Sequence, residues 1–112
     1  MKKDPKIFLR HILDSIAEIE KNIKNISEEK FSLSTPIQDA VIRRLEIIGE
    51  AAKNISADVR KKYNFIPWKK IAGSRDVLIH QYFEVDLPAV WDTATKDLPQ
   101  LKQEIETMLK KL

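Results

Sequence analysis

The sequence predicts an all-α protein, an antiparallel four-helix-type bundle with additional short helices, in a single domain over residues 1–112. Apolar residues recur at steps of three and four along most of the chain, and no stretch shows the period of two that marks a strand. The chain contains only two Gly and five Pro, and charged residues make up 33% of it, a composition typical of helical domains that fold in water. A length of 112 residues suits one hydrophobic core.

The first expected helix begins at Asp4 and Pro5 and runs to about residue 26. An Asp side chain accepts hydrogen bonds from the free N–H groups at a helix start, and Pro at the first helical position has no N–H to lose. The apolar stripe of this helix comprises Leu9, Ile12, Leu13, Ile16, Ile19, Ile23 and Ile26. The stripe predicts a long amphipathic helix with one face in the core.

Residues 27–34 interrupt the helical pattern, and we expect Phe31 and Leu33 to pack this connection onto the core. A second helix follows, in which Thr35 and Gln38 have the spacing of a capping box. The helix runs to about residue 54, and its apolar stripe comprises Ile37, Val41, Leu45, Ile48, Ala52 and Ile55.

A short helical turn over residues 57–63, capped by Ser56, is expected to lead into a third helix over residues 67–82. Two further pieces begin where an Asp precedes a Pro by two residues, at Asp86 and at Asp97. Four main helices with short connections bury their stripes most simply as an antiparallel bundle.

The composition narrows the functional classes. Twenty Lys and Arg against 17 Asp and Glu leave a formal net charge of +3, so nucleic acid would have to be bound by local basic clusters. The chain has no Cys, which favours a reducing cytoplasm and excludes thiolate chemistry and Cys-based zinc sites. The apolar runs are far shorter than the roughly 20 residues of a membrane span, and charged residues interrupt the N-terminal region where a signal peptide would be apolar. We expect a cytoplasmic protein.

The expected third helix carries four polar residues, Arg75, Asp76, His80 and Tyr82, between apolar ones. On a helix Asp76 and His80, four residues apart, lie one turn apart on the same face, and Asp76 can fix the tautomer of the imidazole by a hydrogen bond. Arg75 and His80, five apart, diverge by about 140°. Both can address one phosphate only if the helix deforms near Gly73 or Tyr82, or if a second copy of the chain completes the site. The second option predicts a two-fold dimer with this helix at its axis.

Two arginines and two histidines in one cleft suit the cleavage of RNA by its own 2′-hydroxyl group. One imidazole removes the 2′-proton, another protonates the departing 5′-oxygen, and the guanidinium groups stabilise the charge on the phosphate, so no metal or cofactor is required. A structural interpretation is also open. In it, His80 and Asp76 form a structural hydrogen bond, Arg75 is a surface charge, and Tyr82 is a core residue with its hydroxyl in water.

Three blocks of sequence resemble a known family. Arg75, Asp76, three apolar residues and His80, followed by Tyr82, resemble the signature of the HEPN superfamily: arginine, a polar residue, three residues and histidine. The segments LEIIGEAAKNIS and IPWKKIAGSRDVLIHQYF, with the later Trp91 and LPQLKQEIE, resemble its HepT-type toxin branch. The resemblance covers nearly the whole chain, and the three blocks in order are more specific than the short motif alone.

The resemblance implies a HEPN-like helical bundle that forms a homodimer, a toxin with metal-independent endoribonuclease activity, and an antitoxin that is a nucleotidyltransferase of the MNT type. It assigns Arg75 and His80 as the catalytic pair, Asp76 as the supporting polar residue, and Tyr82 as the residue that the antitoxin modifies with AMP. This chain departs from the pattern in one respect. Many members carry Asn after the arginine, and Asp76 instead places a negative charge where RNA phosphate is expected to bind.

Several other residues are candidates for weaker roles. Lys69 and Lys70 lie about one turn before Arg75 and are candidate RNA contacts, with Tyr63 or Trp68 available to stack on a base. The remaining basic pairs fit solvated helix faces.

Neither histidine has the neighbours of a metal site, and His11 fits a structural or surface position. Gly49 and Gly73 are positions at which two helices can approach closely.

Two other functional classes remain open from the sequence. The chain can be a non-catalytic nucleotide- or protein-binding subunit that positions substrate for a nucleotidyltransferase, because the same bundle and basic groove would serve it. A helical DNA-binding regulator is less well supported, because no helix-turn-helix with a solvent-facing recognition helix is evident and the net charge is small.

Overall fold

The computed structural model describes residues 4–81 and 84–112, with the side chains of residues 4–73 and 85–112. The elements, in chain order, are α1 (Pro5–Ile23), α2 (Glu28–Leu33), α3 (Thr35–Lys53), α4 (Ala57–Lys62), α5 (Trp68–Leu78), β1 (Ile79–Gln81), β2 (Glu84–Val85), α6 (Leu87–Asp92), the π-helical turn η1 (Thr93–Asp97) and α7 (Leu98–Lys111). The predicted all-α class is confirmed, with one small two-stranded ribbon added to the helices. No helix in the described part of the chain is both long and apolar enough to cross a membrane.

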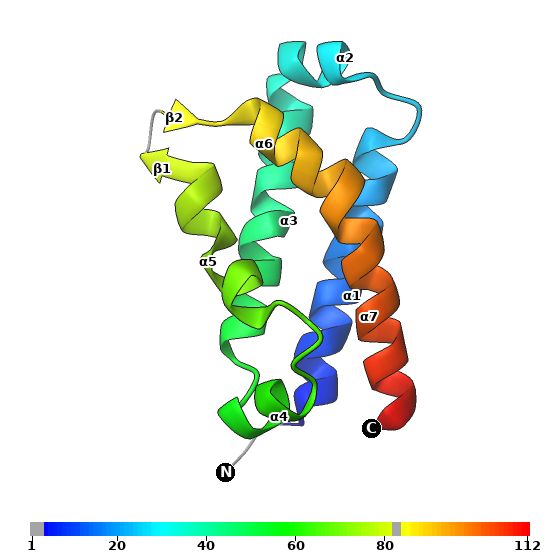
Figure 1. The fold of residues 1–112 in the computed structure, drawn as a ribbon. Helices are drawn as coiled ribbons and strands as arrows, with labels where there is room; N and C mark the ends of the chain where they lie inside the picture. The colour runs from blue at the N-terminus through cyan, green and yellow to red at the C-terminus, as the bar shows by residue number, and fades with distance from the viewer. Residues whose placement is uncertain (1–3, 82–83) are drawn as a thin grey trace.

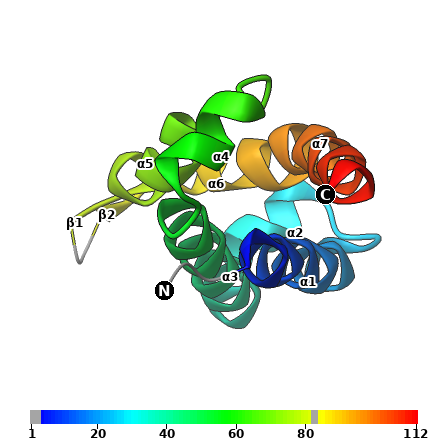
Figure 2. The same cartoon turned by 90° about the horizontal axis from the view of Figure 1, so that it is seen from below.

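The long helices α1, α3, α5 and α7 lie roughly along the long axis of the molecule (Figure 1), and the view from below shows them arranged around a common centre (Figure 2). Buried apolar side chains from all four helices meet there. The larger members of this core are Leu9, Ile12, Ile16, Ile19, Val41, Leu45, Ile48, Trp68, Ile71, Leu98, Leu101, Ile105 and Met108. The stripes read from the sequence therefore face the core.

Two predicted helix starts are confirmed in detail. The Asp4 carboxylate accepts a hydrogen bond from the Lys6 N–H at 2.9 Å, and the Ser56 hydroxyl accepts one from the Val59 N–H at 3.3 Å. The capping box predicted at Thr35 is wrong. Ser34 caps α3 instead, by accepting a hydrogen bond from the Ile37 N–H.

Gln38 has a different partner from the one that the capping box requires. Its side-chain amide donates to the carbonyl oxygens of Phe31 and Ser32, at 2.9 and 3.0 Å. These carbonyls belong to the last turn of α2, where helical carbonyls lack partners within the helix. The short helix α2, which the sequence did not predict, therefore redirects Gln38 away from the start of α3.

The prediction for the connection is half right. Phe31 is fully buried and its ring lies 5.3 Å from the ring of Trp91, whereas the Leu33 side chain is 81% exposed. Since α2 is helical, residues two positions apart point about 200° apart, so both side chains cannot face the core.

The last helices form one continuous rod. Asp86 caps α6 as predicted, by accepting a hydrogen bond from the Ala89 N–H at 3.0 Å. The predicted start after Asp97 is confirmed, because α7 begins at Leu98, but the Asp97 side chain makes no capping hydrogen bond there. The chain is already helical before this point, since the π-helical turn η1 joins α6 to α7 without a break. Pro99 lacks an N–H and its ring crowds the carbonyl four residues earlier, and a widened turn immediately before it lets the helix continue.

The third helix is shorter than predicted. α5 ends at Leu78, and residues 79–81 form β1, which pairs antiparallel with β2 so that Ile79 lies opposite Val85 and Gln81 opposite Glu84. The prediction of a helix to residue 82 is therefore wrong from residue 79 onward. Pairing with a strand that lies further along the chain overrides the local helical pattern, as tertiary contacts commonly do.

Candidate functional site

The first half of α5, the helix that carries Arg75 and Asp76 of the predicted site, is held against the rest of the molecule by buried side chains. Trp68 and Ile71 are buried in the core, and the indole N–H of Trp68 donates to the carbonyl oxygen of Tyr63 at 3.0 Å. On the other side, α5 approaches α3 closely at Gly49, where an added Cβ would lie 3.4 Å from the Ile71 carbonyl oxygen. The predicted close approach at Gly49 is confirmed. At Gly73 no atom of the described part of the chain lies within 4 Å of such a Cβ.

The predicted catalytic pair straddles the end of α5. Arg75 and Asp76 lie in the last turn of the helix, whereas His80 is the central residue of β1. The divergence of about 140° therefore does not apply between Arg75 and His80, because the two are not on one helix. For the same reason, the helical stacking predicted for Asp76 and His80 is not present in the backbone.

The side chains of Arg75, Asp76 and His80 lie outside the part of the chain that the structure describes, and Tyr82 lies outside it altogether. The β1–β2 ribbon that carries His80 lies at the end of α5 away from α4 and extends beyond the helices (Figure 1).

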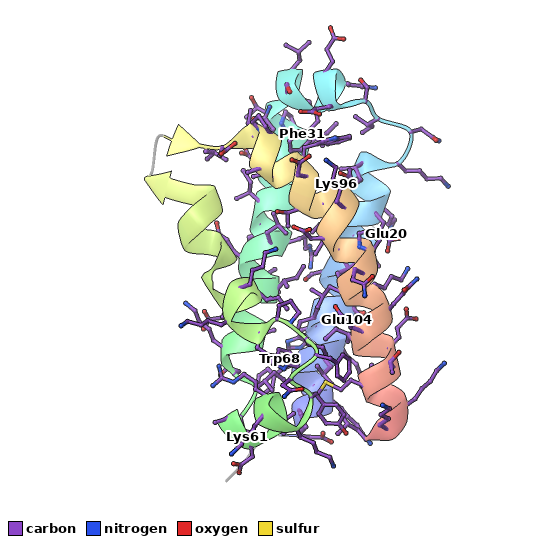
Figure 3. The ribbon with its side chains drawn as sticks, viewed as in Figure 1. Glu20, Phe31, Lys61, Trp68, Lys96 and Glu104 are labelled. Carbon is purple, nitrogen blue, oxygen red and sulfur yellow. The ribbon has the colours of Figure 1, made fainter. Side chains whose placement is uncertain are left out.

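The candidate RNA contacts Lys69 and Lys70 are both exposed on the first turn of α5. Lys70 lines a groove of about 400 Å³ between α5 and α7, whose walls include Leu45, Ile71 and Leu101. The rim has both signs of charge, since it also includes Lys96, Asp97 and Glu104. In Figure 3, Lys96 and Glu104 lie along the η1–α7 rod, while Trp68 lies at the start of α5. This balance of charge gives the groove no preference for phosphate.

The two aromatic residues proposed for base stacking are not available for it. Tyr63 and Trp68 are each only 5% exposed and belong to the core. The exposed ring in this region is that of Phe65, two residues after Tyr63, which the sequence reading did not single out. No local sequence pattern predicts that Phe65 is exposed, because its exposure depends on the burial of Tyr63 and Ile66 on either side of it in the turn.

A second groove, of about 350 Å³, runs between α1 and α3. Its polar lining consists of His11, Arg43, Glu46, Glu50 and Asn54. The His11 imidazole is exposed, as expected. It packs edge-on against the Phe8 ring, with 6.5 Å between the two ring centres. Among the described residues, no three His, Cys, Asp or Glu side chains converge in the manner of metal ligands.

Comparison with known proteins places the chain in a family. Residues 12–108 match the family model described as ribonuclease HepT-like. The chain is 53% identical, over its full length, to half of a Methanocaldococcus jannaschii protein named "Gamma-glutamylcyclotransferase and putative RNase MJ0434". It is 48% identical, over 97% of its length and 90% of the relative, to "Putative RNase MJ1216" of the same organism.

A third relative matches over its whole length. The chain is 44% identical, over 98% of its residues, to all of the Thermococcus cleftensis protein named "Probable ribonuclease HepT". No solved structure matches the chain significantly. The matched region contains α3, α5, the RDVLIH stretch at residues 75–80, η1 and most of α7. These elements include the sequence blocks that carried the resemblance. The chain is a member of the HepT-like ribonuclease family of the HEPN superfamily.

Proposed function

We propose that this ribonuclease is the toxin of a toxin–antitoxin pair and cleaves RNA without a metal ion, as a homodimer with Arg75 and His80 in a shared cleft. The family match over residues 12–108 carries the proposal, because it includes the RDVLIH stretch together with the helices that hold it. The end of α5 between Arg75 and His80 supports it further, since the pair is free of the helical divergence that would separate the two side chains.

The proposed reaction is an internal transesterification. The neutral imidazole of one His80 takes the proton of a ribose 2′-hydroxyl group, and the 2′-oxygen attacks the adjacent phosphorus. The bond from phosphorus to the 5′-oxygen breaks, and the protonated imidazole of the second His80 donates a proton to that leaving oxygen. The products are a 2′,3′-cyclic phosphate and a 5′-hydroxyl group.

The remaining residues of the site stabilise this transfer. The two Arg75 guanidinium groups bind the non-bridging phosphate oxygens and stabilise the negative charge that builds on them. Asp76 supports the site by holding the His80 imidazole in one tautomer, through a hydrogen bond that would form across the end of α5 and not by helical stacking. Histidine suits both proton transfers because its ordinary pKa of about 6.5 keeps both forms populated near neutral pH.

We further propose that the site is regulated by covalent modification. We infer that a nucleotidyltransferase antitoxin of the MNT type transfers AMP from ATP to Tyr82: the phenolic oxygen loses its proton and attacks the α-phosphorus of ATP, and pyrophosphate leaves. The added phosphate would compete for the Arg75 guanidinium and block the path of RNA by its charge and bulk. Tyr82 directly follows β1 in the sequence, two residues after His80, which supports an effect on the site.

The nuclease is tested with the purified protein, labelled single-stranded RNA and a chelator in excess. Cleavage to cyclic-phosphate ends is expected. The His80→Ala variant should lose at least about 100-fold in kcat, the size of a general acid–base contribution, with unchanged helical circular dichroism. His11→Ala is the matched control, because its imidazole is exposed on α1 and should leave the rate unchanged. A fully active His80→Ala enzyme would remove His80 from the mechanism.

The modification is tested by incubating the protein with its proposed nucleotidyltransferase antitoxin and ATP. The chain has only two tyrosines, so mass spectrometry can assign the site with two variants. Tyr63→Phe should still gain the mass of AMP, because Tyr63 is buried, and Tyr82→Phe should gain none. Modification of Tyr82→Phe would refute the assignment.

A further inference from the structure

The turn between α4 and α5 is held rigidly. The Ile66 N–H donates to the Tyr63 carbonyl oxygen at 3.2 Å, and the Trp68 N–H donates to that of Ile66 at 2.8 Å. The Trp68 indole N–H adds a third hydrogen bond, also to the Tyr63 carbonyl. Tyr63, Ile66 and Trp68 all have their side chains in the core. The turn is therefore anchored from both sides.

Phe65 is an exposed aromatic side chain of this turn. Phe65 is 47% exposed, and its ring meets the ring of Tyr63 edge-on at 6.3 Å. A lysine ammonium lies over each ring of this pair. The Lys111 ammonium lies 5.9 Å from the centre of the Phe65 ring, and that of Lys62 lies 5.6 Å from the centre of the Tyr63 ring. We call Phe65, Lys62 and Lys111 the Phe65 patch.

An ordinary explanation exists for the lysines alone. Lys62 and Lys111 lie in the last turns of α4 and α7, where positive charge compensates the negative end of the helix dipole. That explanation does not extend to an aromatic ring that a rigid turn holds outward. An exposed ring flanked by cations is the arrangement by which proteins bind single-stranded nucleic acid, with the ring stacked on a base and the cations on the backbone phosphates.

We propose that the Phe65 patch is a second RNA-binding site, which holds an unpaired nucleotide away from the point of cleavage. The Phe65 ring would stack on the base, and Lys62 and Lys111 would contact the neighbouring phosphates. The inference rests on the proposed function for the identity of the ligand. It assigns single-stranded rather than duplex RNA, because bases are available for stacking only when they are unpaired.

The position of the patch fits an anchor. The turn precedes the first residue of α5, and Arg75 and His80 lie at the other end of that helix, so its eleven residues place the two sites about 15 Å apart along the axis. The base of the molecule, with α4 and the C-terminus, faces the reader in Figure 2, and Lys61 and Trp68 mark this end in Figure 3. RNA that reaches both sites must extend beyond the cleaved bond.

Binding is measured in the His80→Ala background, in which the RNA is not cut. The probe is a fluorescein-labelled oligouridylate of about 16 nucleotides, followed by fluorescence anisotropy. Phe65→Leu keeps an apolar side chain but removes the ring, and should weaken binding by about tenfold; Phe65→Trp should retain it. Joint substitution of Lys62 and Lys111 by Gln should weaken binding. It should also reduce the slope of the logarithm of the binding constant against the logarithm of the salt concentration by about 1.4, or roughly 0.7 for each phosphate contact.

The matched control replaces Lys24 and Lys30 by Gln. Both lysines are exposed and lie around the connection from α1 to α2, far from the Phe65 patch (Figure 1), so the same loss of charge there should weaken binding much less than the loss of Lys62 and Lys111. Equal affinity of Phe65→Leu and the parent for the RNA would overturn the proposal.

Two other results would also overturn the proposal and assign the patch differently. If Phe65→Leu binds RNA normally but sediments as a smaller species, the patch is a contact between copies of the chain. If it binds RNA normally but no longer forms a complex with the nucleotidyltransferase, the patch binds protein. Failure of the proposed function is distinct: the parent protein would then cut no RNA, whatever the Phe65 variants bind.

Discussion

The rings of Phe31 and Trp91 lie 5.3 Å apart at an interplanar angle of 42°, and this contact joins α2 to α6. It fixes the short helix α2 over the end of the bundle, although α2 has only six residues. A helix of this length has little stability of its own in water, so the buried Phe31 side chain supplies most of what holds it in place.

Replacement of Phe31 by Ala should therefore lower the free energy of unfolding by about 3–5 kcal/mol, the usual cost of removing a buried phenylalanine ring. Urea denaturation measures the change. Leu33→Ala is the matched control, because the Leu33 side chain is 81% exposed and its loss should change the free energy of unfolding by less than about 0.5 kcal/mol. Equal losses for the two variants would contradict the arrangement of α2.

The contact between α3 and α5 depends on the size of residue 49. At Gly49 a Cβ would lie 3.4 Å from the Ile71 carbonyl oxygen, which is an ordinary contact, so Gly49→Ala should fold normally. Gly49→Leu adds atoms beyond the Cβ that must displace the backbone of α5, and should cost about 1–3 kcal/mol. Thermal or urea unfolding of both variants checks the prediction.

Gly73 supplies the control for that experiment. It lies on α5, two residues after Ile71, and no described atom lies within 4 Å of an added Cβ. Gly73→Ala should raise the free energy of unfolding by about 0.5–1 kcal/mol through reduced flexibility of the unfolded chain and better helix propensity. A large loss of stability in Gly73→Ala would show that the surroundings of α5 are tighter than described.

The negative charge of Asp76 should weaken the binding of RNA in the proposed site. Asp76→Asn keeps a hydrogen-bonding side chain and removes the charge, so KM for RNA should fall by about threefold at low salt, and by less when salt screens the charge. Asp76→Ala removes the hydrogen bond as well and should lower kcat. Steady-state kinetics of the two variants distinguish charge from positioning, and an unchanged KM in Asp76→Asn would show that the carboxylate does not face the RNA phosphate.

Mixed dimers test whether two subunits share one reaction. A dimer of one parent subunit and one His80→Ala subunit, isolated through two different affinity tags, has a single imidazole in the proposed cleft. Because the mechanism uses one imidazole as base and the other as acid, its kcat should lie close to that of the His80→Ala dimer. Half of the parental activity would mean that each subunit works alone.

The sequence was most informative where a single helix buries a single face. The stripe from Leu9 to Ile19 and the one from Val41 to Ile48 both lie in the core, because helical period alone decides which side chains share a face. It was least informative where distant segments decide the outcome. The Gln38 side chain donates to carbonyl oxygens of α2, a helix that the sequence did not predict. The helix α5 ends at Leu78 because residues 79–81 pair with residues 84–85 as two strands.

The candidate site divides in the same way. Spacing alone left open how Arg75 and His80 meet one phosphate, and the strand that begins at Ile79 removes the helical constraint between them. The identity of the pair came from resemblance, and the roles of Arg75, His80, Asp76 and Tyr82 all stay predictions. Phe65 was missed because its exposure depends on the burial of Tyr63 and Ile66 on either side of it.

The π-helical turn η1 sets the rotational phase of α7 relative to α6. A hydrogen bond from residue i to i+5 takes one residue more per turn than the usual i to i+4, so η1 behaves as a single inserted residue inside an otherwise regular helix. Val90, Ala94 and Leu98, spaced by four and again by four, all remain buried. An alignment that assumes an unbroken α-helix across residues 93–97 will therefore misplace α7 by one position, about 100°, in any homologue that lacks the extra residue.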